Sequence, residues 1–189
     1  MVPRGLRASI QNAAIKPLNT EFSRKVPNKD ESRAGRWAWL TATFLGIGWL
    51  RPGPGTWASA AAVLLWWLIS NFIAPEWRTA TAIIIAGGMI LVGIPAATRI
   101  VRQSGDQDPS FVVIDEVAGQ MIAMIAVPQT WKSLLASFIL FRAFDIAKPP
   151  PLRRLEKFPE GTGIMLDDIG GGLYALAIMQ ALLHFGMLS

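Results

Sequence analysis

Residues 79–98 read TATAIIIAGGMILVGIPAAT, a stretch of 20 residues without one ionisable side chain. About 20 apolar residues are what an α-helix needs to cross a bilayer. Thr56–Ala74 and Ile169–Ser189 are free of Lys, Arg, Asp and Glu over a similar length. These stretches predict an all-α fold, a compact helical membrane protein with about three to five membrane-embedded helices.

Three shorter apolar segments complete this prediction. Trp37–Leu50 carries no charge but has only 14 residues, so we interpret it as an interfacial helix or a re-entrant segment. Val117–Trp131 and Ser133–Phe141 are also short. We expect them to form a tight helical hairpin with its turn at Pro128-Gln129, inserted only when packed against the other helices.

The composition supports a small membrane protein and narrows its chemistry. Of the 189 residues, 52% are hydrophobic and 16% charged, none is cysteine, and His184 is the single histidine. Disulfides, thiolate chemistry and phosphatases that use two histidines are therefore excluded. The whole net charge of +5 lies in residues 1–36. We expect residues 1–36 to be a basic, disordered cytoplasmic tail and residues 37–189 to be one helical membrane domain.

The distribution of charge predicts a topology. With the tail inside, Thr56–Ala74 runs out, Thr79–Thr98 runs back in, the second hairpin goes out and returns, and the last segment runs out. The outside turns then hold only Arg78 and Lys132. All other Lys and Arg residues are then inside, as the positive-inside rule requires. The same topology places four polar motifs on the inner face, which predicts one composite site there.

The strongest motif runs from Asp108 to Gly119 and contains Asp115-Glu116. Neighbouring helical side chains point about 100° apart, so one carboxylate can bind a metal while the other orients water or a basic partner. The alternative is an acidic helix start favoured by the helix dipole.

The second motif is Phe141–Pro149, in which Arg142, Asp145 and Lys148 are spaced by three residues. The spacing places them along one side of a helix that the following prolines end. They form either a charge ladder or a metal ligand between two cations that bind phosphate oxygens.

The remaining motifs flank two predicted crossings. In Gly161–Asp168, the adjacent Asp167 and Asp168 repel unless a cation or a proton relieves them, although one could cap the last helix. Gly46–Thr56 is rich in glycine and proline and is either an ordinary turn or, with Thr56 as N-cap, a phosphate-binding helix start. Together the motifs indicate a carboxylate-held metal that acts on a phosphate ester.

Ile114–Val117, Phe141–Asp145 with Lys148-Pro149, Gly161–Asp168 and Pro54–Thr56 closely resemble, in order and spacing, the signature blocks of the phosphatidylglycerophosphatase A family. The resemblance covers about residues 40–188. It implies an all-helical, Mg²⁺-dependent lipid phosphatase of the bacterial inner (cytoplasmic) membrane, multi-pass, with its active site on the cytoplasmic face. Such an enzyme removes the terminal phosphate of phosphatidylglycerophosphate to give phosphatidylglycerol.

We therefore assign roles to ten residues. The expected catalytic residues are Asp115, Glu116, Asp145 and Asp168. The expected Mg²⁺ ligands are Asp115, Glu116, Asp145, Asp167 and Asp168. The expected phosphate-binding residues are Gly53, Gly55, Thr56, Arg142 and Lys148.

Two alternatives stay open at the level of sequence. The same site would serve a phosphatase or transferase acting on another phospholipid headgroup. A small divalent-cation transporter would use the acids as a relay, although Arg142 and Lys148 would raise the barrier to a cation. The expected partners are the lipid substrate and the membrane, with no nucleic acid. The sequence sets neither the oligomeric state nor the nucleophile, water or a carboxylate.

Overall fold

The computed structural model describes residues 35–155 and 158–188. The chain divides into residues 1–31 and residues 32–189. The predicted basic tail, apart from its last two residues, lies outside the described residues.

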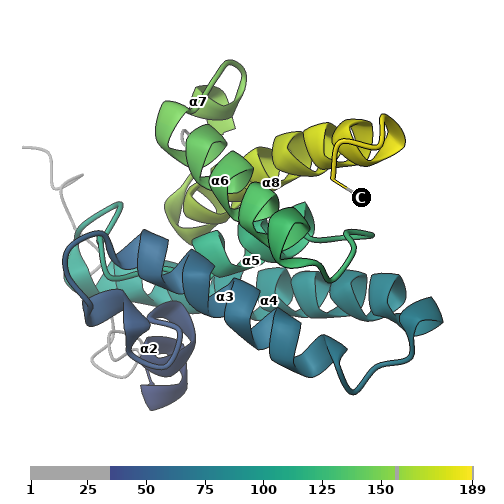
Figure 1. Ribbon diagram of the computed structural model, residues 1–189. Helices are drawn as coiled ribbons and strands as arrows, with labels where there is room; N and C mark the ends of the chain where they lie inside the picture. The colour runs from purple at the N-terminus through teal and green to yellow at the C-terminus, as the bar shows by residue number, and fades with distance from the viewer. Residues whose placement is uncertain (1–34, 156–157, 189) are drawn as a thin grey trace, which may run out of the picture. The chain divides into compact units, whose positions relative to one another are not determined.

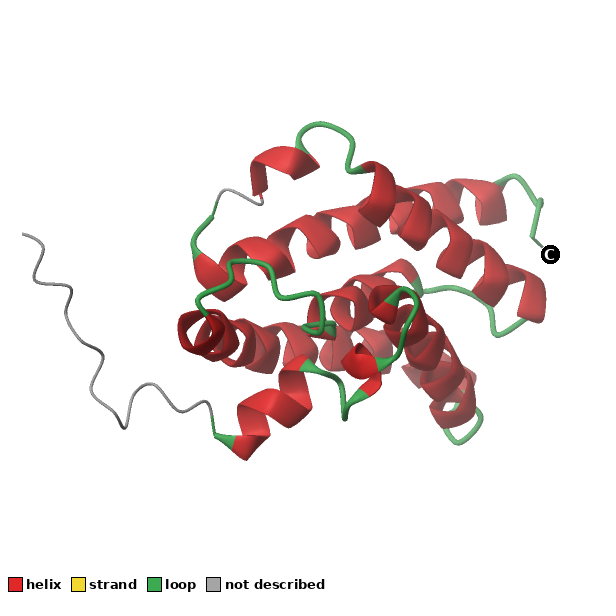
Figure 2. Ribbon diagram, turned by 90° about the vertical axis from the view of Figure 1, so that its left-hand side faces the viewer, coloured by secondary structure: helices red, strands yellow, loops and turns green. Residues whose placement is uncertain are grey.

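The described part of the chain consists of helices and loops, without a strand (Figures 1 and 2). The all-α prediction is therefore confirmed. The elements are α2 (Arg36–Ala42), the 3-10 helix η2 (Ile47–Trp49), α3 (Pro54–Ser70), α4 (Pro75–Ser104), α5 (Ile114–Ala123), α6 (Trp131–Ala147), α7 (Leu152–Leu155) and α8 (Glu160–His184).

Helix α5 is the centre of the helical unit. It contacts α3, α4, α6 and α8, and every residue in it except Glu116 is buried. Its ten residues extend only about 15 Å. The predicted hairpin is wrong in this detail: the first arm ends at Ala123, and residues 124–130 form a loop longer than a Pro128-Gln129 turn.

Two glycines allow α5 and α8 to cross closely. A Cβ on Gly172 would overlap the backbone carbonyl of Gly119. A Cβ on Gly119 would overlap the ring of Phe141 and lie 2.6 Å from the carbonyl oxygen of Asp168. Small residues at a crossing let two helix backbones approach. This contact fixes the start of α5 beside the Asp167-Asp168 segment of α8.

Two predicted helix starts need correction. Helix α8 begins at Glu160 rather than at Ile169, so Asp167 and Asp168 lie inside the helix and neither caps it. A search for charge-free stretches ends at the first charge, whereas this helix continues through Asp167 and Asp168, whose side chains are buried. Helix α3 begins at Pro54, with Gly53 at φ +67° as N-cap, so Thr56 is a helical residue and not the cap.

A stack of aromatic rings holds the segment before α5 in place. The ring of Phe111 stacks on Trp39, at 5.3 Å between centroids, and on Trp49, at 4.8 Å. The backbone N–H of Val113 donates to the carbonyl of Ala42 over 2.8 Å. The N-terminus of α5 therefore has a fixed position relative to α2 and η2.

Much of the surface is apolar. Large hydrophobic side chains are exposed along α3, α4, α6 and α8. Among the described residues, α4 and α8 are long and apolar enough to cross a membrane; α3 and α6 have 17 residues each. Soluble monomers rarely expose contiguous apolar surface on this scale. These features indicate membrane association.

We predict that Gly172→Ala destabilises the protein by about 1–3 kcal/mol, because the added methyl group must displace the Gly119 backbone. Thermal unfolding in detergent micelles measures the change. The matched control is Gly88→Ala in α4, where a Cβ meets nothing within 4 Å. Alanine is the better helix former, so the control should be neutral or slightly stabilising. Equal melting temperatures for the two variants would contradict the close crossing.

Candidate functional site

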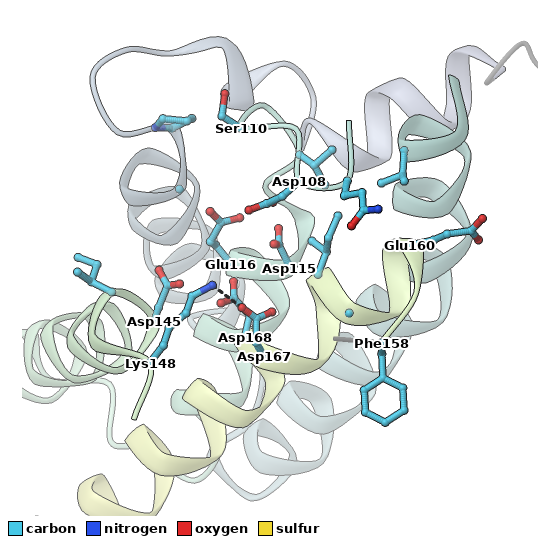
Figure 3. Close-up of a pocket in the computed structure, with 18 of the residues that line it drawn as sticks. Asp108, Ser110, Asp115, Glu116, Asp145, Lys148, Phe158, Glu160, Asp167 and Asp168 are labelled. Atoms are coloured by element: carbon cyan, nitrogen blue, oxygen red, sulfur yellow. Dashed lines mark hydrogen bonds and ion pairs between the residues drawn. The ribbon is translucent and has the colours of Figure 1, made fainter. Parts of the chain in front are cut away.

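A cavity of about 1020 Å³ opens where several helix ends meet (Figure 3). Its walls come from the start of α3, the end of α4 with the loop that follows, the start of α5, the end of α6 and the first half of α8. The four motifs that the sequence predicted to share one face do converge here.

Nine of the ten predicted site residues line this cavity. They are Gly53, Gly55, Asp115, Glu116, Arg142, Asp145, Lys148, Asp167 and Asp168. Thr56 is exposed and is not among the lining residues. The structure therefore does not place Thr56 with the other candidate phosphate-binding residues.

Three carboxylates form a cluster that could hold a metal ion. Asp115 and Glu116 from α5 and Asp168 from α8 each offer an oxygen, and these oxygens lie within 4.8 Å of one another. Asp115 and Asp168 are buried and Glu116 is partly buried. Asp115 Oδ1, Glu116 Oε2 and Asp168 Oδ2 are buried atoms without a hydrogen-bond partner in the described residues.

This cluster is electrostatically unfavourable without a compensating positive charge. Burial, and next the charge of Glu116, raise the pKa of Asp115 well above its usual range. Burial also raises the pKa of Glu116. A cation that bound the three oxygens would favour the charged carboxylates. Carboxylate oxygens are the ligands of hard cations such as Mg²⁺, so the residues present fit such an ion.

Two ion pairs join the predicted cations Arg142 and Lys148 to the two remaining predicted acids. Arg142 pairs with Asp145 one helical turn away. Lys148 Nζ donates to Asp167 Oδ2 at 2.6 Å, from the end of α6 to α8. Lys148 is the C-cap of α6 with φ +43°. It therefore does not continue the helical row that the sequence predicted for Arg142, Asp145 and Lys148. Asp145 thus orients the side chain of Arg142, and Asp167 orients that of Lys148.

Arg142 also has an unused donor. Its Nε is buried and has no hydrogen-bond partner among the described residues. A guanidinium N–H in that condition favours an anionic ligand, because an unpaired buried donor is costly.

Gly55 sets the distance between α3 and the acidic cluster. A Cβ at this position would overlap Glu116 Oε1 and would lie 3.1 Å from Arg142 Nη1. A side chain at residue 55 would require the ends of Glu116 and Arg142 to shift, so glycine permits the close approach of α3 to both. The glycine-rich turn thus forms part of the cavity wall.

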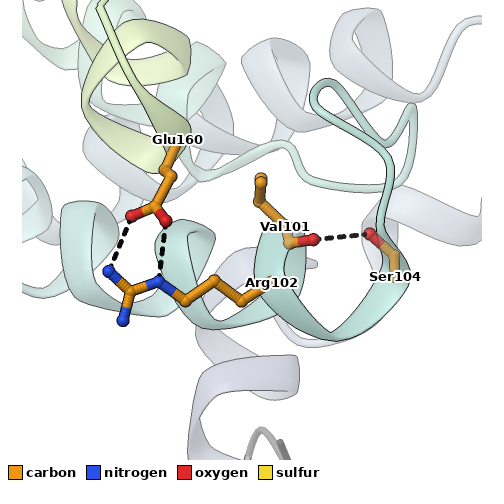
Figure 4. A network of polar contacts seen from close by, with 4 residues as sticks. All are labelled: Val101, Arg102, Ser104 and Glu160. Carbon is orange, nitrogen blue, oxygen red and sulfur yellow. Dashed lines mark hydrogen bonds and ion pairs between the residues drawn. The ribbon is translucent and has the colours of Figure 1, made fainter. Parts of the chain in front are cut away.

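The sequence analysis did not identify several lining residues as functional. Arg102 and Glu160 form a two-bond ion pair between α4 and α8, with Nε to Oε1 at 2.7 Å and Nη2 to Oε2 at 2.9 Å (Figure 4). No local pattern joins residues this far apart in the chain. Asp108 and Ser110 also line the cavity (Figure 3). Their position within the Asp108–Gly119 motif was the available signal.

Comparison with known proteins identifies the family of the chain. Residues 40–183 match the family model of phosphatidylglycerophosphatase A. The chain belongs to this family. All four motifs of the cavity lie within the matched region, so the resemblance noted in the sequence is confirmed.

Curated relatives share about one third of their residues with the chain. The phosphatidylglycerophosphatase A of Haemophilus influenzae is 33% identical over 77% of this chain and 88% of the relative. The Escherichia coli protein of the same name is 32% identical over 77% and 83%. A putative phosphatidylinositol-3-phosphatase of Bacteroides thetaiotaomicron is 35% identical over 74% and 89%. No solved structure matches the chain.

We predict that the Lys148–Asp167 pair shows energetic coupling. Lys148→Met removes the cation and leaves Asp167 in a buried position, which should lower the free energy of unfolding by about 1–3 kcal/mol. Asp167→Asn in the same chain should restore part of the loss. Chemical denaturation of the two single variants and the double variant in micelles measures the coupling. Strictly additive losses would show that the pair contributes nothing.

Proposed function

We propose that this protein hydrolyses the terminal phosphate monoester of phosphatidylglycerophosphate. Water adds to phosphorus, the bond between phosphorus and the ester oxygen breaks, and phosphatidylglycerol and inorganic phosphate are released. Family membership supports this reaction, as do the names of two of the relatives. The reaction belongs to phospholipid synthesis.

The observation that carries the proposal is the meeting of a cluster of three carboxylates with the cations Arg142 and Lys148 in one cavity. Asp115, Glu116 and Asp168 offer oxygens to one point, and Arg142 and Lys148 line the same cavity. Carboxylates alone would repel a phosphate, and cations alone would not activate water. A phosphate monoester needs both kinds of group, whereas a cation path does not need the fixed cations.

Mg²⁺ is the cofactor that we propose for this cluster. Asp115, Glu116 and Asp168 would hold it, and Asp145 and Asp167, also predicted ligands, lie beside them in the cavity. When bound, a divalent ion polarises phosphoryl oxygens and lowers the pKa of a bound water. A carboxylate left free by the metal accepts the proton of the attacking water.

The other residues of the cavity bind and orient the phosphate in this proposal. Arg142 and Lys148 neutralise charge that develops on the phosphoryl oxygens. Asp145 and Asp167 hold these two cations in place through their ion pairs. The backbone of Gly53 and Gly55 forms the wall of the cavity at the start of α3.

We further propose that the protein crosses the bacterial inner membrane several times, with the cavity on the cytoplasmic side. Arg78 lies near the start of α4 and Lys132 near the start of α6, whereas the cavity uses the opposite ends of both helices. Arg78 and Arg102 are separated by about 36 Å along α4, more than the hydrocarbon thickness of about 30 Å. The many cations then lie inside and the few outside.

The direct test is phosphate release by the purified full-length protein in mixed micelles. Phosphatidylglycerophosphate should be the best substrate in a panel that includes phosphatidylinositol 3-phosphate and phosphatidic acid. The inositol lipid belongs in the panel because one relative is named for it. Faster release from the inositol lipid would reassign the substrate, and release from none of the three would overturn the proposal.

Activity should require a divalent cation, because carboxylates outnumber cations among the residues that line the cavity. We expect chelation to abolish phosphate release and Mg²⁺ to restore it, with Mn²⁺ able to substitute. Calorimetric titration of the chelated protein with Mg²⁺ gives an independent readout of binding. Full turnover in excess chelator would contradict the metal assignment.

The substitution Asp115→Asn distinguishes between two roles of Asp115: a metal ligand, or an acid that only favours the start of the helix. Asparagine keeps the size of the side chain but loses the charge, so we expect turnover to fall at least about 10²-fold with little loss of stability. Asp106→Asn is the matched control: Asp106 is exposed in the preceding loop, outside the cavity lining. It should retain full turnover. More than half of normal turnover in Asp115→Asn would show that Asp115 has no catalytic role.

A further inference from the structure

A second hollow, of about 390 Å³, lies between α3 and α6 and is entirely apolar in its side chains apart from the indole N–H groups. Helix α3 contributes Ala60, Val63, Leu64 and Trp67. Helix α6 contributes Trp131, Leu134, Leu135 and Phe138. We call these eight residues the α3–α6 groove. None of the residues assigned to the catalytic cavity belongs to it.

The α3–α6 groove lies along two helices that also contribute residues to the catalytic cavity. On α6, Phe138 is followed at helical spacing by Arg142 and Asp145 of the cavity. On α3, Ala60 lies about two turns after the Gly53 cap. The cavity uses the start of α3 and the end of α6, so both helices extend from it toward the groove. From Arg142 to Trp131 is about 16 Å along α6.

The groove is open to the surroundings along its length. Leu64 is 55% exposed, Trp67 45%, Leu135 47% and Trp131 72%. Its lining contains no charged side chain. A flexible apolar chain can enter such a groove sideways from a bilayer without desolvating a polar group.

We propose that the α3–α6 groove binds an acyl chain of the lipid whose phosphate occupies the catalytic cavity. This inference rests on the proposed function and adds to it the binding site for the apolar part of the substrate. A phospholipid carries its phosphate and its acyl chains at opposite ends of one molecule. The protein presents a charged cavity and an apolar groove in the same order along one pair of helices, which is the observation that selects this occupant.

Photolabelling of the wild-type protein tests where the chain lies. The probe is a phosphonate analogue of phosphatidylglycerophosphate with a diazirine in the middle of one acyl chain. The phosphonate link resists hydrolysis. We expect labels on residues 60–67 and 131–138, lost when the unlabelled phosphonate is added in excess. Labels spread over the exposed faces of α4 and α8 without competition would mean general lipid contact, and would overturn the proposal. A groove free of label, as when a second copy covers it, would also overturn it.

A pair of substitutions tests whether the groove contributes to substrate binding. Ala60→Phe places a ring in the groove, whereas Ala61→Phe places the same ring on the adjacent residue, which is similarly half-buried but does not line the groove. The substrates are dioleoyl and dihexanoyl phosphatidylglycerophosphate. We expect Ala60→Phe to raise KM for the dioleoyl lipid about tenfold and to change the dihexanoyl lipid less than twofold. Ala61→Phe should change neither.

The two substrates separate failure of this inference from failure of the proposed function. If the wild-type protein hydrolyses neither lipid, the proposed function is wrong. If it hydrolyses both and Ala60→Phe affects them equally, the groove does not bind the chain. Because a Phe at residue 60 could disturb packing, Leu64→Trp at an exposed groove position and Leu65→Trp beside it form a second pair with the same expected contrast. Photolabelling needs no substitution and decides the matter if both variants unfold.

Discussion

The structure depends on keeping three carboxylates together in its interior. Asp115, Glu116 and Asp168 come from two helices that meet at the floor of the cavity. Burial disfavours the charge of each acid, and their proximity adds mutual repulsion. Such a cluster lowers stability unless a positive charge balances it, so its cost is understandable only if the cluster has a function.

Glycine contacts make this convergence sterically possible. The crossing at Gly119 and Gly172 brings α5 and α8 close enough for their acids to share one point. Gly55 does the same for α3, whose backbone reaches Glu116 and Arg142. At all three positions a methyl group would occupy space that another atom already fills. The glycines therefore position the acids although they carry no functional group.

The sequence was sufficient to predict the helical class and nine of the residues that line the cavity, because both depend on composition and local spacing. Apolar stretches predicted helices, and charges next to them predicted the acids and cations of the cavity. Long-range contacts were not predictable in this way. The start of α8 was placed nine residues late because Asp167 and Asp168 stand at the boundary before the apolar segment. Their burial and the Lys148–Asp167 pair come from helix packing, as do the short central α5 and the Arg102–Glu160 pair.

The arrangement of α3 and α6 connects the chemistry to the membrane. Both helices carry site residues at one end and the apolar groove beyond it. With a chain in the groove, the phosphate of the same lipid is confined to the cavity. Its approach to the carboxylates is then a step within one complex and no longer an encounter between two free molecules. Binding energy from an apolar chain that does not react can then hold the reacting phosphate in place. A soluble phosphate ester lacks that chain, so the groove gives the protein a physical means of preferring lipid phosphates over soluble ones.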